Sequence, residues 1–287
     1  MCRRADENVP EINRAIERIL ILVLELQEII ADSLVLNSFP LYHYTNISSL
    51  KAILNNNSIK FNELNNVDDM QEKESKNYTN HGNYTYVSCW TGARKESIPM
   101  WYLYCRGKPE DMLRIQLPAH PFKEDNFSNM SMNIVENGKF RELTKQDDLQ
   151  KYNGKIHVRT PNNVKQLLHK VYYSDNPELL CPIESEQLYN PNRVVITNYH
   201  SNGFTKNTYW SFQQEYRYIV SFSKEDKITP PDAIFLNLKD SAINRMKIIT
   251  GPEFDKYKDL ENLLSKYNLA YSKSVLTKKV KITQFNE

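Results

Sequence analysis

Two charged residues within an aromatic stretch are the first candidates for chemistry in this sequence. Glu215 and Arg217 lie in Trp-Ser-Phe-Gln-Gln-Glu-Tyr-Arg-Tyr-Ile-Val at 210–220. In a strand, residues two apart project from the same face, so the carboxylate and the guanidinium are expected side by side. Charges among rings are costly to bury unless they have a partner or a function. The pattern therefore fits either a polar site or a structural ion pair.

A histidine in a second aromatic stretch is the other candidate. His43 is the centre of Leu-Tyr-His-Tyr-Thr at 41–45, and a helical apolar pattern follows over 47–55. Tyr42 and Tyr44 are expected on one face of a strand and His43 on the other. An imidazole at the end of a strand can hydrogen-bond a hydroxyl or a phosphate of a ligand, and it can equally be a satisfied structural histidine.

Aromatic and hydroxyl side chains between the two stretches offer further contacts for a planar ligand. A strand is predicted over 84–90, and a short helix beginning at Pro99 places Trp101 and Tyr104 on one face. Tyrosine is abundant, with 18 residues, and such rings suit a cleft that stacks a flat ligand as well as an ordinary core. The candidates for substrate binding are Tyr44, Thr45, Tyr86, Ser88, Trp101, Tyr104 and Arg217.

A polar segment with three carboxylates follows the first predicted strands. Residues 65–72 read Asn-Asn-Val-Asp-Asp-Met-Gln-Glu. Such a cluster could bind a cation or orient a histidine, but it is also typical of a solvated loop or a helix cap. The sequence leaves both interpretations open.

Several common catalytic and binding motifs are absent from the sequence. It contains no phosphate-binding loop, no GxGxxG turn, no GxSxG elbow and no HExxH helix. The six histidines include no pair four residues apart and have no neighbouring cysteine ligand. We therefore predict no metal site.

The composition is that of an ordinary soluble globular protein. Of 287 residues, 25% are charged and 40% are apolar, and the net charge of +2 predicts no strong field for nucleic acid or membranes. The longest apolar run, 19–24, is too short to span a membrane, and the beginning of the sequence has no secretory signal. The cysteines at 2, 89, 105 and 181 form no CxxC pair and indicate reduced thiols. We expect a cytoplasmic protein with no membrane partner.

Short predicted strands outnumber helices after residue 38. Beyond those already named, strands are predicted over 59–62, 112–117, 155–159, 169–173, 217–222, 233–238, 246–250 and 274–282. A helix is predicted over 260–267, whereas 119–165 is polar and weak in pattern, as in an insertion or flexible excursion. Many short strands with few helices indicate an α+β fold with flanking helices and a bent, largely antiparallel sheet.

One long amphipathic helix is predicted over 11–36, ahead of that domain. Isoleucine, valine and leucine recur at helical spacing, and further leucines broaden the apolar stripe beyond what one packing surface needs. The helix either docks on its own domain or contacts a second subunit or a partner. We therefore divide the chain into an N-terminal helix, 1–38, and a single α+β domain, 39–287, and expect 11–36 to be the contact of any homo-oligomer.

The order of these motifs resembles the bacterial domain of unknown function 2971. The resemblance covers about residues 39–285 and leaves the leading helix outside. The family has no settled activity, so the resemblance implies a domain but no reaction. It rests on Leu-Tyr-His-Tyr-Thr at 41–45, Asp68-Asp69, Val-Ser-Cys-Trp at 87–90, Met100, Trp101, Tyr104, Glu215-Tyr-Arg217 and Ile-Ile-Thr-Gly-Pro at 248–252.

More distantly, the sequence resembles the ADP-ribosyltransferase fold. There, a histidine on an early strand, an aromatic residue on a middle strand and a glutamate on a late strand grip NAD. The resemblance implies that His43 holds a ribose hydroxyl, that a ring within 86–104 stacks on nicotinamide, and that Glu215 stabilises an oxocarbenium-like transition state. Arg217 or Arg106 would neutralise the pyrophosphate.

Three functions are therefore open at this point. The first is an NAD-using ADP-ribosyltransferase or glycohydrolase, of the toxin or phage-defence kind, with catalytic His43 and Glu215 and a protein or nucleic-acid acceptor. The second is an NAD-independent enzyme that acts on a nucleotide or nucleic-acid phosphate. The third is a non-catalytic binding or regulatory module that assembles through its N-terminal helix.

Overall fold

The computed structural model describes Ile16 and residues 40–73, 82, 85–105, 108–123, 132–143, 167–181, 186–188, 195–197, 203–221 and 230–281. The helix predicted over 11–36 lies outside the described residues except for Ile16, which is helical and 47% exposed. The division at residue 38 and an oligomer contact through that helix remain predictions.

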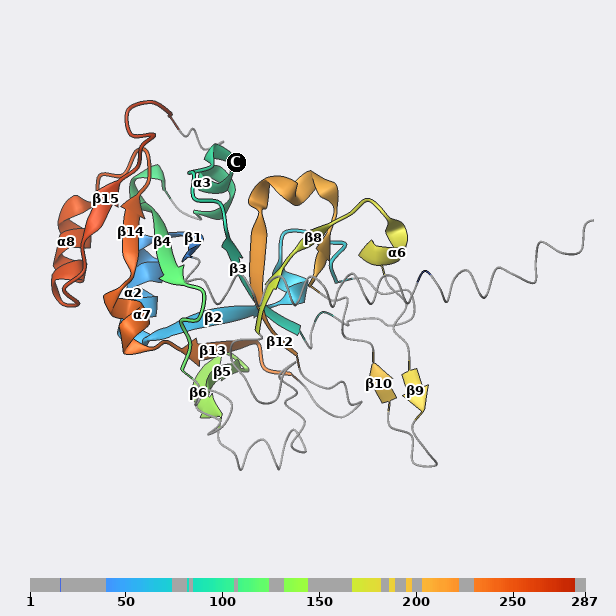
Figure 1. Cartoon of the computed structure of the whole chain (residues 1–287). Helices are drawn as coiled ribbons and strands as arrows, with labels where there is room; N and C mark the ends of the chain where they lie inside the picture. The colour runs from blue at the N-terminus through green and yellow to red at the C-terminus, as the bar shows by residue number, and fades with distance from the viewer. Residues whose placement is uncertain are drawn as a thin grey trace, which may run out of the picture.

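One sheet of 11 strands dominates the domain (Figure 1). Its order is β15-β14-β4-β1-β3-β2-β13-β5-β6, with β12 added on β3 and β7 on β12. Among its described pairings, that of β14 with β15 alone is parallel, so the largely antiparallel α+β fold is confirmed. The strands are β1 (Pro40–Asn46), β2 (Ser58–Glu63), β3 (Thr85–Thr91), β4 (Met112–Pro118), β5 (Met132–Glu136), β6 (Lys139–Leu143), β7 (Leu168–Lys170), β12 (Glu215–Ser221), β13 (Ala233–Asn237), β14 (Lys247–Thr250) and β15 (Tyr271–Lys273).

The sheet divides at β3, because the two strands on one edge of β3, β1 and β2, separate from each other. On the opposite edge, β12 pairs with β3 over its whole length, from Thr85 to Thr91. On the edge where the sheet divides, β2 pairs with β3 only at Tyr86 and Val87, and β1 pairs with β3 only at Thr91. Residues 88–90 of β3 therefore lie between the ends of two strands that run apart, and Figure 1 shows β2 and β13 crossing the direction of β4 and β14. This division is the bend predicted from the many short strands.

Helix α2 (Ile47–Asn56) joins β1 to β2 and has well-defined ends. The side chain of Asn46 accepts a hydrogen bond of 2.9 Å from the Ser49 amide, which caps the first turn. Asn57 ends the helix at φ 49°, in the left-handed region where asparagine is tolerated. Leu50 and Leu54, four residues apart, pack into the main core under the sheet.

The other helices are short. They are α3 (Ile98–Tyr104), α6 (Pro177–Leu180), α7 (Asp240–Asn244) and α8 (Tyr257–Ser265), with 3-10 turns η1 (Leu64–Asn66), η3 (Pro109–Asp111) and η6 (Thr208–Gln213). Helix α3 starts where the sequence predicted, with Ser97 as its cap and a proline in its first turn. Its Met100 and Trp101 pack with Tyr44 and Met112 in a second, smaller core.

Three parts of the predicted pattern are wrong. The last strand is β15, at 271–273, because the segment from Ser274 onwards turns away and Val275 donates its amide to the Glu96 carboxylate at 2.9 Å. The weakly patterned segment 119–165 contains the hairpin β5–β6, which pairs with β13. The strand predicted over 169–173 is divided between β7 and β8 (Tyr172–Tyr173), and β8 pairs in parallel with β11 (Thr205–Lys206). A second small pair joins β9 (Glu186–Leu188) to β10 (Val195–Thr197).

Candidate functional site

A cavity of about 290 Å³ opens where β1 and β3 separate. His43 from β1 and Glu215 from β12 both line it, although they are far apart in the sequence. Tyr104 from α3 and Cys89 from β3 complete this part of the wall. Of the residues predicted from the sequence, the structure brings six to this cavity: His43, Tyr44, Thr45, Tyr104, Glu215 and Arg217.

His43 and Glu215 reach the cavity from opposite faces of the sheet. Glu215 is paired with Thr91, and Thr91 is paired with Tyr42, so the side chains of these three residues share one face. His43, the next residue after Tyr42, points to the other face. Both can line one cavity because it occupies the gap beside β3. A ligand here would lie within the division of the sheet and not on one of its surfaces.

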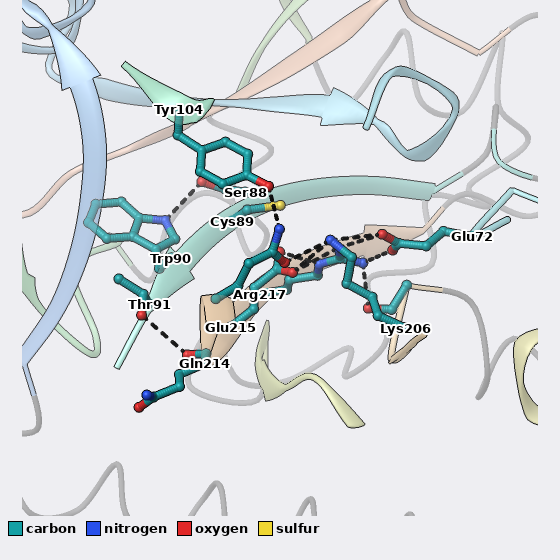
Figure 2. A network of polar contacts seen from close by, with 12 residues as sticks. Glu72, Ser88, Cys89, Trp90, Thr91, Tyr104, Lys206, Gln214, Glu215 and Arg217 are labelled. Carbon is teal, nitrogen blue, oxygen red and sulfur yellow. Dashed lines mark hydrogen bonds and ion pairs between the residues drawn. The ribbon is translucent and has the colours of Figure 1, made fainter. Parts of the chain in front are cut away.

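Glu215 belongs to a buried network of four charges, which Figure 2 shows from close by. Its Oε1 accepts from Arg217 Nε at 2.6 Å, and its Oε2 accepts from Arg217 Nη2 at 3.1 Å and from Lys206 Nζ at 3.2 Å. Arg217 also donates two hydrogen bonds to Glu72, one of them Nη2 to Oε1 at 2.9 Å, and Lys206 lies 3.1 Å from the same carboxylate. Two cations and two carboxylates therefore neutralise each other where Arg217 is 0% and Glu215 4% exposed.

This network keeps Glu215 ionised. Burial by itself would raise its pKa, but the charges of Arg217 and Lys206 outweigh burial and lower the pKa to about 2. The pKa of Arg217 lies well above its usual value, because the two carboxylates outweigh the burial that would lower it. Glu215 is therefore a carboxylate at neutral pH and cannot act as a general acid.

The network also connects the wall of the cavity to strand β12. Glu72 is at the end of the acidic segment whose residues Asn66, Val67 and Asp68 line the cavity. Lys206 donates to Gln213 at 2.9 Å, and Gln213 in turn donates to the Tyr104 hydroxyl. Glu72 is thus not a cation site, because its carboxylate anchors the end of the segment on β12, whereas Asn66, Asp68 and Gln71 are exposed as in a solvated loop.

His43 is oriented by the strand from which β1 separates. Its Nδ1 lies 2.9 Å from the Cys89 carbonyl oxygen, and since a carbonyl can only accept, Nδ1 carries the proton. Burial lowers the pKa of His43, although the carbonyl partner opposes this in part, so the ring is neutral at pH 7. Nε2 then offers a lone pair, which suits the hydroxyl group of a ligand.

The pKa of His43 predicts a pH dependence of stability. Because the folded-state pKa is below the usual 6.5, stability is fully present above pH 6.5 and is lost as the pH falls through that value, where the unfolded chain binds the proton more readily. A His43→Asn variant keeps a donor for the Cys89 carbonyl but does not titrate. As the pH falls from about 7.5 to about 5.5, the melting temperature of the wild type should fall relative to that of the variant. A constant difference over this range would show that His43 does not titrate as described.

Three predicted binding residues are not at this cavity. Glu215 and Arg217 share a face with Thr91 and Cys89, so Tyr86 and Ser88 point to the opposite side of β3. Tyr86 is fully buried in the main core, where its hydroxyl donates to the Pro231 carbonyl. Ser88 accepts a hydrogen bond of 3.0 Å from the Trp90 indole and lines a neighbouring cavity on that side of β3.

The third is Trp101, which is fully buried behind Tyr44. The two rings pack edge to face with centroids 4.8 Å apart, and the Trp101 indole donates to Glu96 at 3.0 Å. Trp101 therefore supports the ring of Tyr44 and does not face a ligand. Trp90, which the sequence did not single out as a ligand contact, lines the cavity instead and packs against His43 with ring centroids 5.2 Å apart.

Within the described part of the chain, no group of His, Cys, Asp and Glu side chains is arranged to hold a metal ion. Cys89, Cys105 and Cys181 are free thiols. Burial, and the nearby charge of Glu215 after it, raise the pKa of Cys89 well above its usual range, so this thiol in the cavity wall is protonated. None of the described helices is long and apolar enough to cross a membrane.

Comparison with known proteins gives distant structural matches. No protein-family model matches the sequence, and no curated protein matches it. Thermus sp. 2.9 DarT in complex with NAD+ is 13% identical, with 82% of this chain and 95% of that chain covered and a TM-score of 0.29. Thermus sp. 2.9 DarT in complex with ADP-ribosylated ssDNA is 12% identical, with 83% and 94% covered and a TM-score of 0.28.

Proposed function

We propose that this protein cleaves the bond between nicotinamide and ribose in NAD and transfers ADP-ribose to water or to an acceptor. The observation that supports the proposal is the meeting of a neutral imidazole, His43, and an ionised carboxylate, Glu215, at one cavity lined by aromatic rings. The distant resemblance of the sequence to ADP-ribosyltransferases suggests the same pair of residues.

Binding would use the side of the cavity formed by β1 and α3. Nε2 of His43 would accept a hydrogen bond from a ribose hydroxyl, because its tautomer leaves that nitrogen unprotonated. The ring of Tyr104 would stack on the nicotinamide, and Tyr44, which is 3% exposed, would form the wall beside it. Tyr44 is held in this wall by the Ser97 amide, which donates to its hydroxyl at 2.9 Å.

Glu215 would act on the charge that develops during the reaction. As the bond from C1′ to the nicotinamide nitrogen breaks, its electron pair leaves with the nicotinamide and the ribose becomes positively charged. A fixed carboxylate stabilises that charge more than it stabilises the ground state. The oxygen of water or of an acceptor group then bonds to C1′ and gives up its proton to solvent water. The toxin or defence role, the cytoplasmic location and the identity of the acceptor remain predictions.

The structure is less favourable to the predicted role of Arg217 as a phosphate ligand. Its guanidinium is fully buried and donates to both Glu72 and Glu215. A phosphate would have to displace a carboxylate from this pair. Arg106, the alternative ligand for the pyrophosphate, lies outside the described residues.

A second candidate function follows from the same contacts. Both oxygens of Glu215 already accept hydrogen bonds from cations, which favours a structural role for this carboxylate. The protein would then be a non-catalytic module that binds a nucleotide in the cavity without cleaving it. The two functions differ in turnover and not in binding.

Incubation with NAD tests the proposal directly. Nicotinamide release should be measured with the protein alone, with single-stranded DNA and with cell extract, so that water, nucleic acid and protein are each offered as acceptor. Release in any of these mixtures supports the proposed reaction. Binding of NAD without release in all three would favour the non-catalytic module, and absence of both binding and release would reject NAD as the ligand.

A further inference from the structure

A second cavity, of about 320 Å³, adjoins the candidate site. His43, Thr45, Ser49 and Asn62 are among the residues that line both, so the two cavities are compartments of one cleft. Glu215 lines the first compartment and not the second. Each has a volume near the lower end of the range for ligand pockets, about 300–1,000 Å³, so together they suit a ligand with two parts.

The second compartment follows from the division of the sheet. Its walls come from β1 and β2, which run apart, from residues 87–90 of β3 between them, and from α2, which joins the two strands. The compartment is therefore built from regular elements around the gap.

The two compartments differ in charge. Asp68, Lys206, Glu215 and Arg217 line the first. In the second, Lys60 alone of the described lining residues has a charged side chain, and it is exposed. The remaining walls are apolar, as at Ile53 and Phe235, or carry amides and hydroxyls, as at Asn56 and Ser58. Such a surface favours an uncharged ring with polar edges over a phosphate.

Ser58 gives an independent sign that a polar group belongs here. The residue is 3% exposed, and its Oγ has no hydrogen-bond partner among the described residues. A buried hydroxyl without a partner costs free energy, and rotation about its single side-chain bond can offer it to a ligand in the compartment. The hydroxyl therefore fits an amine or a ring nitrogen of a bound ring.

The junction between the compartments lies at the start of α2. Thr45 and Ser49 line both compartments, and the helix cap Asn46 lines the first. The start of this ten-residue helix is its electropositive end, which attracts phosphate groups. A diphosphate at this point would connect a sugar near Glu215 to a second nucleoside beyond His43.

We infer that the second compartment is a binding site for an uncharged nucleoside and that the ligand of the whole cleft is a dinucleotide. Its identification with the adenosine half of NAD rests on the proposed function, whereas the site itself rests on the cavity and on Ser58. The ligand would pass through the gap beside β3, with one nucleoside in each compartment.

Blocking the second compartment tests this inference. Ala52 is exposed on α2 and lines that compartment alone of the two, so Ala52→Trp should fill it without disturbing the core. Lys51→Trp, at the preceding exposed position of the same helix and lining neither compartment, is the matched control. Affinities for AMP, nicotinamide mononucleotide and NAD should be measured by calorimetry. Ala52→Trp should lower the affinity for AMP and for NAD by about tenfold or more and leave the affinity for nicotinamide mononucleotide unchanged. The control should bind all three as wild type does.

Ser58→Ala is the second test, and it is read out by melting temperature and by AMP affinity. Removal of a hydroxyl without a partner should leave the melting temperature unchanged or raise it, while AMP binding weakens by about threefold to tenfold, the effect of one hydrogen bond. A lower melting temperature with unchanged AMP affinity would show that the hydroxyl is structural.

The outcomes separate this inference from the proposed function. AMP binding that is lost in Ala52→Trp, in a protein that releases no nicotinamide, would support the nucleoside site and reject the reaction. Nicotinamide release with no AMP binding by the wild type, or with equal NAD affinity in Ala52→Trp and Lys51→Trp, would overturn the nucleoside site and leave the reaction standing.

Discussion

Glu215→Gln should lower the rate of nicotinamide release by about a hundredfold to a thousandfold, equivalent to about 3–4 kcal/mol of transition-state stabilisation. The substitution keeps the shape of the side chain and one acceptor oxygen but removes the negative charge. NAD affinity should fall much less, because the ribose carries little charge in the ground state. Single-turnover rates and NAD affinity should be measured on the same preparation.

The charge network makes a control essential for this experiment. Loss of the Glu215 charge leaves Arg217 and Lys206 with one carboxylate and should destabilise the protein, whether or not the residue is catalytic. Glu72→Gln removes the same charge from the same network, and Glu72 does not line the cavity. The two variants should therefore lose similar stability but differ in rate.

The comparison decides between the two candidate functions. A rate that falls far more in Glu215→Gln than in Glu72→Gln, at equal melting temperature, identifies Glu215 as a catalytic residue. Equal losses of rate in the two variants, each in proportion to the folded fraction, would mean that Glu215 is a structural member of the network and would leave the catalytic proposal without its central residue.

Local patterns in the sequence were sufficient for most of the fold. The alternation at 41–45 gave β1, and the proline after Ser97 gave the start of α3. The hairpin β5–β6 also had a local signal, because Asn137 and Gly138 form its turn with φ values of 51° and 70°. An Asn-Gly pair of this kind is a strong hairpin signal, but the flanking strands alternate too weakly to predict the hairpin from the sequence.

The site depends on register, which the sequence does not specify. The pairing of Glu215 with Thr91 puts Tyr86 and Ser88 on the face of β3 opposite Glu215, and a shift by one residue would bring them to the same face as Glu215. The long-range partners of Glu215 and Arg217 cannot be predicted from local sequence patterns either. Glu72 is 145 residues from Arg217, and Lys206 stands in a polar stretch without a pattern. A structural ion pair is one of the two interpretations that the sequence allows for Glu215 and Arg217, but the other two charges, Glu72 and Lys206, join it only through the tertiary structure.

Arg217→Met should be the most destabilising of the substitutions considered for this network. Methionine fills much of the same space, but Glu72 and Glu215 would remain buried with Lys206 as their one cation. Breaking a buried pair from one side leaves an uncompensated charge and costs about 3–5 kcal/mol. Urea denaturation should show this loss, and because Glu72 anchors the segment with Asn66 and Asp68, NAD binding should weaken as well.

A less buried ion pair provides the control for this substitution. Arg141 Nε lies 3.0 Å from Glu136 Oε2, with side chains 27% and 21% exposed, so Arg141→Met should cost less than about 1 kcal/mol. A double variant, Arg217→Met with Glu72→Gln, leaves one cation and one carboxylate, Lys206 and Glu215, still 3.2 Å apart. It should recover part of the lost stability, since the remaining charges balance. If Arg217→Met cost no more than Arg141→Met, or if the double variant were less stable than the sum of the single changes, the network would not be held together by charge compensation.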